Sequence, residues 1–327
     1  MGDEMRIVLV GAVEGSRVAL EALISAGQPP ALVVTLPAHL CDRHSDFADL
    51  GKPAREAGCE VFYTSDINSP ATIAAVGKFK PDLVLVIGWS QICRQRFREI
   101  AALGTIGYHP AALPRLRGRA VIPWTILLGE ETTASTLFWI DEGTDSGPIL
   151  LQEAFPVHPD ETAQSLYLKH MDAIRRLVPE AINAVKAGNP PRVEQQHELA
   201  SYCAKRTPAD GLIDWREPAE RILALIRAVG HPYPGAFTYD RGFKITIDVA
   251  TEFPVAGRYI GLPGQIQAHS DSGFLVMCGD GRCIEVTQCR PQDARRPPIH
   301  AKLGDAGERP DRPIVLQPRV PIARQAS

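Results

Sequence analysis

Four short apolar runs near the N-terminus constrain the fold of this chain more than any other feature. Each run is rich in β-branched, leucine or aromatic residues and has the length of a single strand, and two segments between the runs repeat apolar residues at helical spacing. The strand candidates are residues 6–11, 31–36, 60–63 and 81–88, and the helix candidates are residues 16–26 and 69–79. Strands that alternate with helices at this spacing predict an α/β domain with a doubly wound, Rossmann-like parallel sheet.

The predicted sheet also indicates where ligands bind. In a doubly wound sheet, ligands lie beyond the carboxyl ends of the strands, which is where residues 88–93 and His109 are expected. Residues 11–15 lack the third glycine of the dinucleotide-binding pattern Gly-x-Gly-x-x-Gly, and Glu14 would repel a pyrophosphate. We therefore interpret this segment as a tight strand-to-helix turn.

The second half of the chain has a different pattern. A long amphipathic helix is predicted over residues 162–187, and the Gly-Asn-Pro-Pro sequence at 188–191 ends it. About ten polar residues then read as a linker, after which short strand candidates separated by turns predict a small, mostly antiparallel barrel of the OB type. We expect an N-terminal domain at 1–200, a β-barrel-like domain at 201–303 and a flexible tail at 304–327.

Charge and cysteine content exclude some classes of protein. The net charge of −3 argues against the chain as a whole being a nucleic-acid binder. The seven cysteines contain no Cys-x-x-Cys pair, which is typical of free thiols in a reducing compartment. No apolar run has the roughly 18 residues of a membrane span, and no signal-peptide pattern precedes the first strand. We expect a cytoplasmic protein without membrane contact.

The candidate chemistry lies in residues 107–119, Gly-Tyr-His-Pro-Ala-Ala-Leu-Pro-Arg-Leu-Arg-Gly-Arg, and in an Asp-Ser-Gly turn that contains Asp145. A carboxylate beside His109 would raise the proton affinity of the imidazole and fix its tautomer, as an acid/base catalyst requires. Asp145 also has a structural interpretation, because an aspartate before glycine commonly accepts hydrogen bonds from turn amides. The remaining histidines have no metal-ligand spacing, so we assign no metal site.

The first motif resembles the signature of the folate-dependent formyltransferases, Asn-x-His-Pro-x-Leu-Leu-Pro-x-x-Arg-Gly followed by Asp-x-Gly. Residues 206–211 (Arg-Thr-Pro-Ala-Asp-Gly), Asp214-Trp215 and residues 232–237 (Pro-Tyr-Pro-Gly-Ala-Phe) resemble the C-terminal domain of the same family. The resemblance therefore covers about residues 6 to 303. Within the family, the chain is most similar to enzymes that formylate amino groups of sugar nucleotides, such as 4-amino-4-deoxyarabinose.

The resemblance implies roles for individual residues. His109 and Asp145 match the catalytic pair, so residues 1–200, which contain both, are the implied catalytic domain. The implied co-substrate is 10-formyltetrahydrofolate. Gln91, Ile92 and Cys93 match the loop whose backbone holds the pterin-like ring of the folate. Arg119 matches an arginine that contacts the acceptor, and the segment before the catalytic aspartate is implied to bind the acceptor through Asp141, Glu142, Gly143 and Thr144.

One position departs from the signature. Gly107 stands where the family has an asparagine whose amide helps to stabilise the oxyanion of the tetrahedral intermediate. Loss of one such donor typically slows a reaction by a factor of about 10² to 10³. Ser90, Tyr108, a backbone N–H or a water replaces the amide, or the chemistry differs. Alternatively, glycine makes room for a bulkier acceptor or supplies a positive φ.

Four functions are compatible with these residues. The first is transfer of a formyl group to the primary amine of a small acceptor, a sugar-nucleotide amine. The second is formylation of methionyl-tRNA, which requires a basic surface, whereas residues 201–327 hold 17 Lys and Arg against 14 Asp and Glu. The third is a non-catalytic, regulatory folate-binding protein, and the fourth is a hydrolase of the formyl-folate. We favour the first, with a small-molecule partner, no nucleic acid and a homodimer as one expected assembly.

Overall fold

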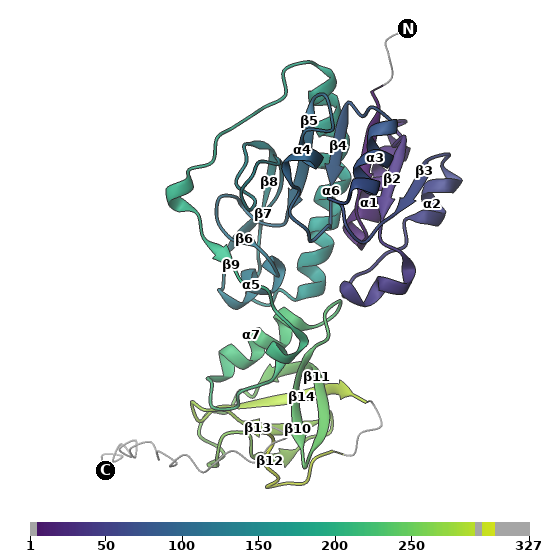
Figure 1. The fold of residues 1–327 in the computed structure, drawn as a ribbon. Coiled ribbons are helices and arrows are strands. Elements are labelled where there is room, and N and C mark those ends of the chain that lie inside the picture. The colour runs from purple at the N-terminus through teal and green to yellow at the C-terminus, as the bar shows by residue number, and fades with distance from the viewer. Residues whose placement is uncertain (1–4, 292–295, 305–327) are drawn as a thin grey trace, which may run out of the picture.

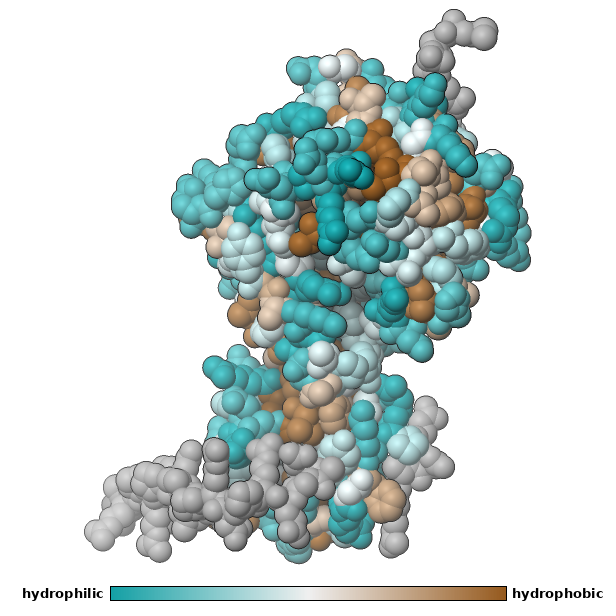
Figure 2. Space-filling model, in the orientation of Figure 1, coloured by the Kyte–Doolittle hydropathy of each residue, from teal (hydrophilic) through white to brown (hydrophobic). Residues whose placement is uncertain are grey.

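The computed structural model describes residues 5–291 and 296–304, which form two lobes joined through a narrower waist (Figures 1 and 2). The expected tail at 304–327 lies outside the described residues except for Gly304. The N-terminal lobe is built on a seven-stranded sheet of order β3-β2-β1-β4-β5-β7-β8. Its strands are β1 (Ile7–Val10), β2 (Leu32–Thr35), β3 (Glu60–Tyr63), β4 (Leu83–Val86), β5 (Gly104–His109), β7 (Thr132–Trp139) and β8 (Ile149–Pro156).

The sheet is doubly wound, as the sequence predicts, but it is mixed rather than wholly parallel. Strands β1 to β5 are parallel to their neighbours, whereas β7 runs antiparallel to β5 and β8 runs antiparallel to β7. Strands β1, β2 and β4 are buried along their whole length, because helices cover both faces of a parallel sheet. The helices of this lobe are α1 (Glu14–Ser25), α2 (Gly51–Glu56), α3 (Pro70–Lys78), α4 (Gln95–Arg98), α5 (Val121–Leu127) and α6 (Ala163–Lys186).

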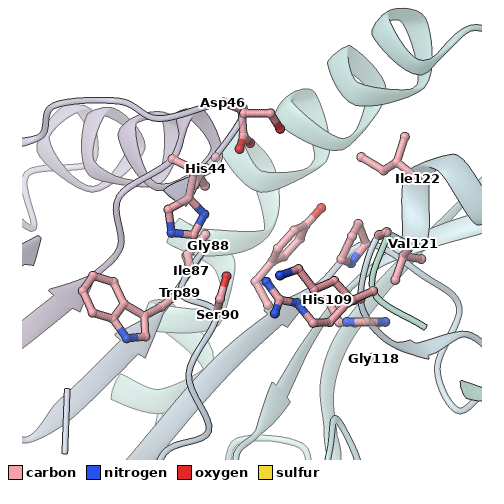
Figure 3. Close-up of a pocket in the computed structure, with 18 of the residues that line it drawn as sticks. His44, Asp46, Ile87, Gly88, Trp89, Ser90, His109, Gly118, Val121 and Ile122 are labelled. Atoms are coloured by element: carbon pink, nitrogen blue, oxygen red, sulfur yellow. The ribbon is translucent and has the colours of Figure 1, made fainter. Parts of the chain in front are cut away.

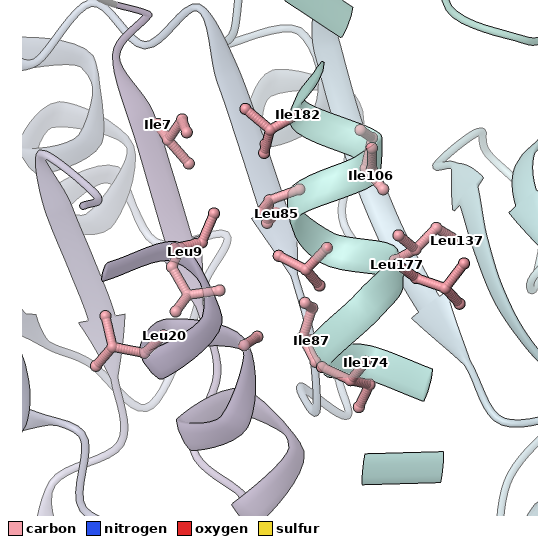
Figure 4. Packing of buried hydrophobic residues seen from close by; sticks show 14 of the residues in the cluster. Ile7, Leu9, Leu20, Leu85, Ile87, Ile106, Leu137, Ile174, Leu177 and Ile182 are labelled. Carbon is pink, nitrogen blue, oxygen red and sulfur yellow. The ribbon is translucent and has the colours of Figure 1, made fainter. Parts of the chain in front are cut away.

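The two faces of the sheet have separate cores. On one face, Leu9, Leu85 and Ile106 pack against Leu20 of α1 and Leu177 of α6 (Figure 4). On the other face, alternate residues of the same strands pack against α3 and α4. Helix α6 begins at an N-cap, since the Thr162 side chain accepts a hydrogen bond from the Ser165 N–H.

The segment after α6 is packed against the N-terminal lobe, whereas its composition predicts a linker. Val193 forms a bridge with Ile149 at the start of β8, and β9 (Tyr202–Cys203) pairs in parallel with β6 (Arg117–Gly118). Backbone and side-chain hydrogen bonds therefore hold this segment against the N-terminal lobe and against the predicted catalytic motif.

The C-terminal lobe is a five-stranded antiparallel sheet of order β10-β11-β14-β13-β12, consistent with the predicted barrel. Bridges from Gly304 to Tyr239 of β10 and from Lys302 to Gln265 beside β12 tie the two sheet edges to one short segment. Helix α7 (Ala219–Val229) packs on this sheet, and Ile122 and Leu166 of the N-terminal lobe join the same apolar core. The strands are β10 (Ala236–Asp240), β11 (Phe243–Glu252), β12 (Ile266–His269), β13 (Phe274–Met277) and β14 (Cys283–Arg290).

Candidate active site

The last residue of β5 is His109, whose ring is 4% exposed. Its Nε2 lies 2.7 Å from the carbonyl oxygen of Leu116, and its Nδ1 lies 3.4 Å from Oδ2 of Asp145. Both ring nitrogens therefore face oxygen acceptors. The ring presents an N–H to both oxygens only when it carries both protons, and the short distance from Nδ1 to the carboxylate permits proton exchange between the two side chains.

Asp145 is fixed by its backbone and by a second donor. Its φ of 50° lies in the left-handed region, which aspartate tolerates better than most residues. The Gly118 N–H donates to Asp145 Oδ2 at 2.8 Å, so one carboxylate oxygen serves both the glycine and the histidine. Leu116 and Ala120 in the neighbouring loop also have positive φ. Strained backbone of this kind gathers where the surrounding structure fixes a functional geometry.

A buried arginine braces the Asp145 turn. The Arg117 guanidinium donates to Oε1 of Gln195 at 2.6 and 3.2 Å, and the Gln195 amide donates to the carbonyl oxygens of Asp145 and Gly147. Gly118 must be glycine here, because a Cβ on it would lie 2.6 Å from the Cys203 carbonyl oxygen. The sequence motif contains Arg117, but no sequence signal connects it to a glutamine in the segment after α6.

A cavity of about 910 Å³ opens at the carboxyl ends of the strands and borders His109. Figure 3 shows His109 between the loop at Ile87–Ser90 on one side and Val121 and Ile122 on the other. Residues 205–208 and 233–235 of the C-terminal part also line the cavity, so both lobes contribute to it. The structure thus brings the predicted site to the strand ends where doubly wound sheets bind ligands.

Gly107 lines this cavity, but its missing side chain leaves no open space. A Cβ at this position would lie 2.8 Å from Cζ of Phe138 and 3.0 Å from Cγ1 of Ile140. The φ of Gly107 is not among the positive values, so the expectation of a left-handed glycine is wrong. Glycine was also expected to make room for a bulkier acceptor. The space that its Cβ would fill is occupied by the Phe138 ring, so it is not open to a ligand.

The structure narrows the choice of a replacement oxyanion donor. The Tyr108 hydroxyl already contacts Ser135 and His170 on the opposite face of the sheet from Gly107, which removes it from consideration. Ser90 lines the cavity and is exposed. It therefore stays a candidate.

The loop predicted to hold the folate lines the cavity over its whole length. The Gln91 side chain is engaged within the protein, accepting from the Ile67 N–H and Trp89 Nε1 and donating to the Ser65 carbonyl oxygen. Ile92 is 61% exposed and offers an apolar surface. Burial raises the pKa of the Cys93 thiol to about 12, as expected for a small buried apolar residue rather than a nucleophile.

The predicted acceptor-binding residues divide into two groups. Arg119, Asp141, Gly143 and Thr144 line the cavity, whereas Glu142 is exposed and does not line it. Asp141 Oδ1 accepts from the Gly143 N–H and the Ser146 hydroxyl, so this carboxylate stabilises the turn that leads to Asp145.

The wall beyond His109 contains residues that the sequence analysis did not identify. Tyr167 of α6 donates to Asp46 Oδ2 at 2.7 Å, and His44 lies in the same loop as Asp46 (Figure 3). Burial lowers the pKa of His44, and the Arg119 charge lowers it further. No motif marks this loop, since its residues meet the cavity only through the folding of the chain.

Among residues 5–291 and 296–304, no group of three or more His, Cys, Asp or Glu side chains could hold a metal ion. No helix in the same ranges is long and apolar enough to cross a membrane.

Comparisons with known proteins give a consistent family. A model described as formyl transferase matches residues 5–182, and one described as formyl transferase, C-terminal domain, matches residues 205–303. A protein named methionyl-tRNA formyltransferase from Symbiobacterium thermophilum is 34% identical over 299 residues, covering 89% of this chain and 90% of that protein.

Two solved structures share the fold. An N-formyltransferase from Helicobacter canadensis, in complex with folinic acid and dTDP-3-aminofucose, matches with a TM-score of 0.66 and 18% identity over 86% of this chain and 99% of that one. HypX from Aquifex aeolicus, in complex with tetrahydrofolic acid, matches with a TM-score of 0.61 and 20% identity over 88% of this chain and 44% of that one.

Proposed function

Because the chain belongs to the formyl transferase family, whose reaction is folate-dependent transfer of a formyl group, we propose that it formylates the primary amine of a small acceptor, an amino sugar attached to a nucleotide. The observation that most supports catalysis of this transfer is the pair formed by His109 and Asp145 beside a cavity lined by both lobes.

The reaction has three chemical requirements, and the pair serves the two that move protons. The amine nitrogen attacks the formyl carbon on N10 of the folate and loses a proton, the carbonyl oxygen becomes an oxyanion, and the bond from carbon to N10 breaks as N10 gains a proton. In our proposal, Asp145 accepts the amine proton and His109 gives a proton to N10. The proton on Asp145 then passes to Nδ1 of His109, which restores the starting state of the pair.

The residues near the folate loop fit a reduced folate. A flat heterocycle is well held by backbone amides and carbonyls next to apolar side chains. Residues 88–93 offer such a backbone, and Trp89, Ile92 and Ile140 line the cavity beside them. We infer that the donor binds on this side of His109.

The charges around the cavity favour a small anionic amine as the acceptor. Arg119 and Lys205 line the cavity and suit a phosphate, while Asp145 and Asp46 suit the cationic form of an amine. The loop at 37–50 contains one Arg against three Asp, so it supplies no basic surface for a nucleic acid at the cavity. An amino sugar carrying a diphosphate matches both charges.

Methionyl-tRNA is the second candidate acceptor. It is favoured by the name of the Symbiobacterium relative at 34% identity, whereas the Helicobacter enzyme with a sugar nucleotide is related at 18%. We place it second because of the acidic loop and the weak positive balance of the C-terminal part.

The test is a transfer assay with 10-formyltetrahydrofolate and a panel of amines. The panel contains amino-sugar nucleotides, amino-sugar phosphates, free amino sugars and methionyl-tRNA, with tetrahydrofolate release measured and products identified by mass. We expect a formylated amino-sugar nucleotide and no detectable formyl-methionyl-tRNA. A higher kcat/KM for methionyl-tRNA than for every sugar would refute the proposed acceptor while leaving formyl transfer intact.

A further inference from the structure

A second histidine borders the cavity and has no role in the chemistry described above. His170 of α6 is completely buried, and it lines the same cavity as His109. Its Nδ1 lies 2.8 Å from the Ser135 hydroxyl and 3.2 Å from the Tyr108 hydroxyl, and the two hydroxyls are 2.9 Å apart. Phe155 packs edge-on against the ring at 5.0 Å between centroids.

These contacts favour one position for the proton of the His170 ring. Burial, together with the nearby His109 and Lys169, lowers the pKa of His170 to about 3, so the ring is neutral at neutral pH. When Tyr108 donates to Ser135 and Ser135 donates to Nδ1, both hydroxyl protons are used and Nδ1 is an acceptor. The single N–H of the neutral ring is then on Nε2.

The Nε2 of His170 has no partner in the protein. Five buried side-chain atoms in the described part of the chain share this property, and they belong to Gln28, Thr35, Thr133, His170 and Arg227. Of these residues, His170 is the one that lines the cavity. A buried donor without a partner is unfavourable unless a ligand or water satisfies it.

The position of His170 indicates which ligand it meets. Side chains alternate along β5, so Tyr108 lies on the α6 face of the sheet while Gly107 and His109 lie on the other face. Trp89 and Cys93 of the folate loop belong to the core on that other face. His170 is therefore on the side of the cavity away from the folate loop, next to Tyr167 and Met171.

We propose that His170 is an acceptor-binding residue whose Nε2–H donates a hydrogen bond to an oxygen atom of the bound amine substrate. This inference rests on the proposed function, because it requires an acceptor that carries hydroxyl, ether or phosphate oxygens. It makes His170 a determinant of specificity and leaves proton transfer to His109 and Asp145. A neutral N–H suits a sugar oxygen, since it donates without introducing charge into a buried wall.

Two substitutions separate this role from a structural one. The amide of His170→Gln reaches about as far as Nε2 and keeps a donor at that position. The shorter amide of His170→Asn reaches about as far as Nδ1 and keeps the contacts to Ser135 and Tyr108. Thr133→Val is the matched control, because it removes another buried, unpartnered polar atom that does not line the cavity.

The assay compares an amino-sugar nucleotide with methylamine, which has no oxygen, using 10-formyltetrahydrofolate as donor. We expect His170→Asn to lower kcat/KM for the amino-sugar nucleotide about tenfold to a hundredfold, mainly through KM, and to leave the methylamine rate unchanged. His170→Gln should retain most of the sugar activity, Thr133→Val should change neither rate, and the Kd for 5-formyltetrahydrofolate should be the same in all variants.

Other outcomes overturn the inference. Equal losses with both amines, a weaker folate Kd, or a Gln variant more impaired than the Asn variant would each indicate a structural or donor-side role. Failure of the proposed function is recognised separately, because the unsubstituted protein would then transfer no formyl group to any amino-sugar nucleotide, and the inference would fall with it.

Discussion

Substitution of Gly107 by asparagine tests how this chain differs from the family signature. A Cβ at residue 107 would lie 2.8 Å from Cζ and 3.0 Å from Cε1 of Phe138, and 3.0 Å from Cγ1 of Ile140. Phe138 is 4% exposed, so neighbouring residues enclose most of its ring. Overpacking of this kind typically costs about 1 to 3 kcal/mol. Because the backbone φ is ordinary, this steric cost is the main term.

We therefore expect Gly107→Asn to lower the melting temperature by several degrees and not to accelerate transfer. A domain of roughly 150 to 250 residues loses about 2 to 4 °C per kcal/mol of destabilisation. Gly107→Ala should show most of the same loss, since the Cβ alone makes the contacts. Gly77→Ala is the control, because the nearest atom to its added Cβ is 3.9 Å away in Ile100. That change in helix α3 should be neutral or stabilising.

The double variant Gly107→Asn, Phe138→Leu gives the decisive measurement. Leucine removes the outer ring atoms that meet residue 107, so the two changes should be less destabilising together than the sum of the single changes, by about 1 kcal/mol or more. An amide that gains this space can act on the oxyanion, and turnover should exceed that of Phe138→Leu alone, by up to a factor of about 10². Thermal unfolding and single-turnover kinetics check both effects. Strict additivity, or a Gly107→Asn protein with an unchanged melting temperature and faster turnover, would refute the steric argument.

Three further experiments test other parts of the site. His109→Ala and Asp145→Asn should each slow transfer by a factor of about 10² to 10⁴, and the double variant should be little slower than either because the pair acts as a unit; multiplicative losses in steady-state rates would argue against shared proton handling. Titration with 5-formyltetrahydrofolate should give saturable binding and raise the melting temperature, and no binding at millimolar concentration would remove the assigned donor. Gln195→Leu should lower both the melting temperature and kcat, since it leaves the buried Arg117 guanidinium without its main acceptor. Normal kcat in that variant would show that the brace on Asp145 is dispensable.

Local patterns predicted the α/β class of the first lobe and the β-rich class of the second. Apolar runs such as residues 81–88 form central strands because both faces of the sheet are covered, and this requirement is visible in the sequence itself. The antiparallel strands β7 (Thr132–Trp139) and β8 (Ile149–Pro156), which flank the aspartate turn, were not predicted. They are defined by the pairing of β7 with β5 and of β8 with β7, which joins distant parts of the chain.

The contacts of the site likewise include one that the sequence predicted and others that only the folded chain shows. The spacing of His109 and Asp145 in a recognisable motif predicted that they would meet, and their ring and carboxylate lie 3.4 Å apart in the structure. The contact between Arg117 and Gln195 joins residues 78 positions apart, and no local pattern encodes it. The filling of the space at Gly107 by Phe138 and the unpartnered Nε2 of His170 likewise depend on which side chains adjacent strands and α6 bring together. Periodicity reports the face on which a residue lies, whereas the packing of distant segments decides what that residue touches.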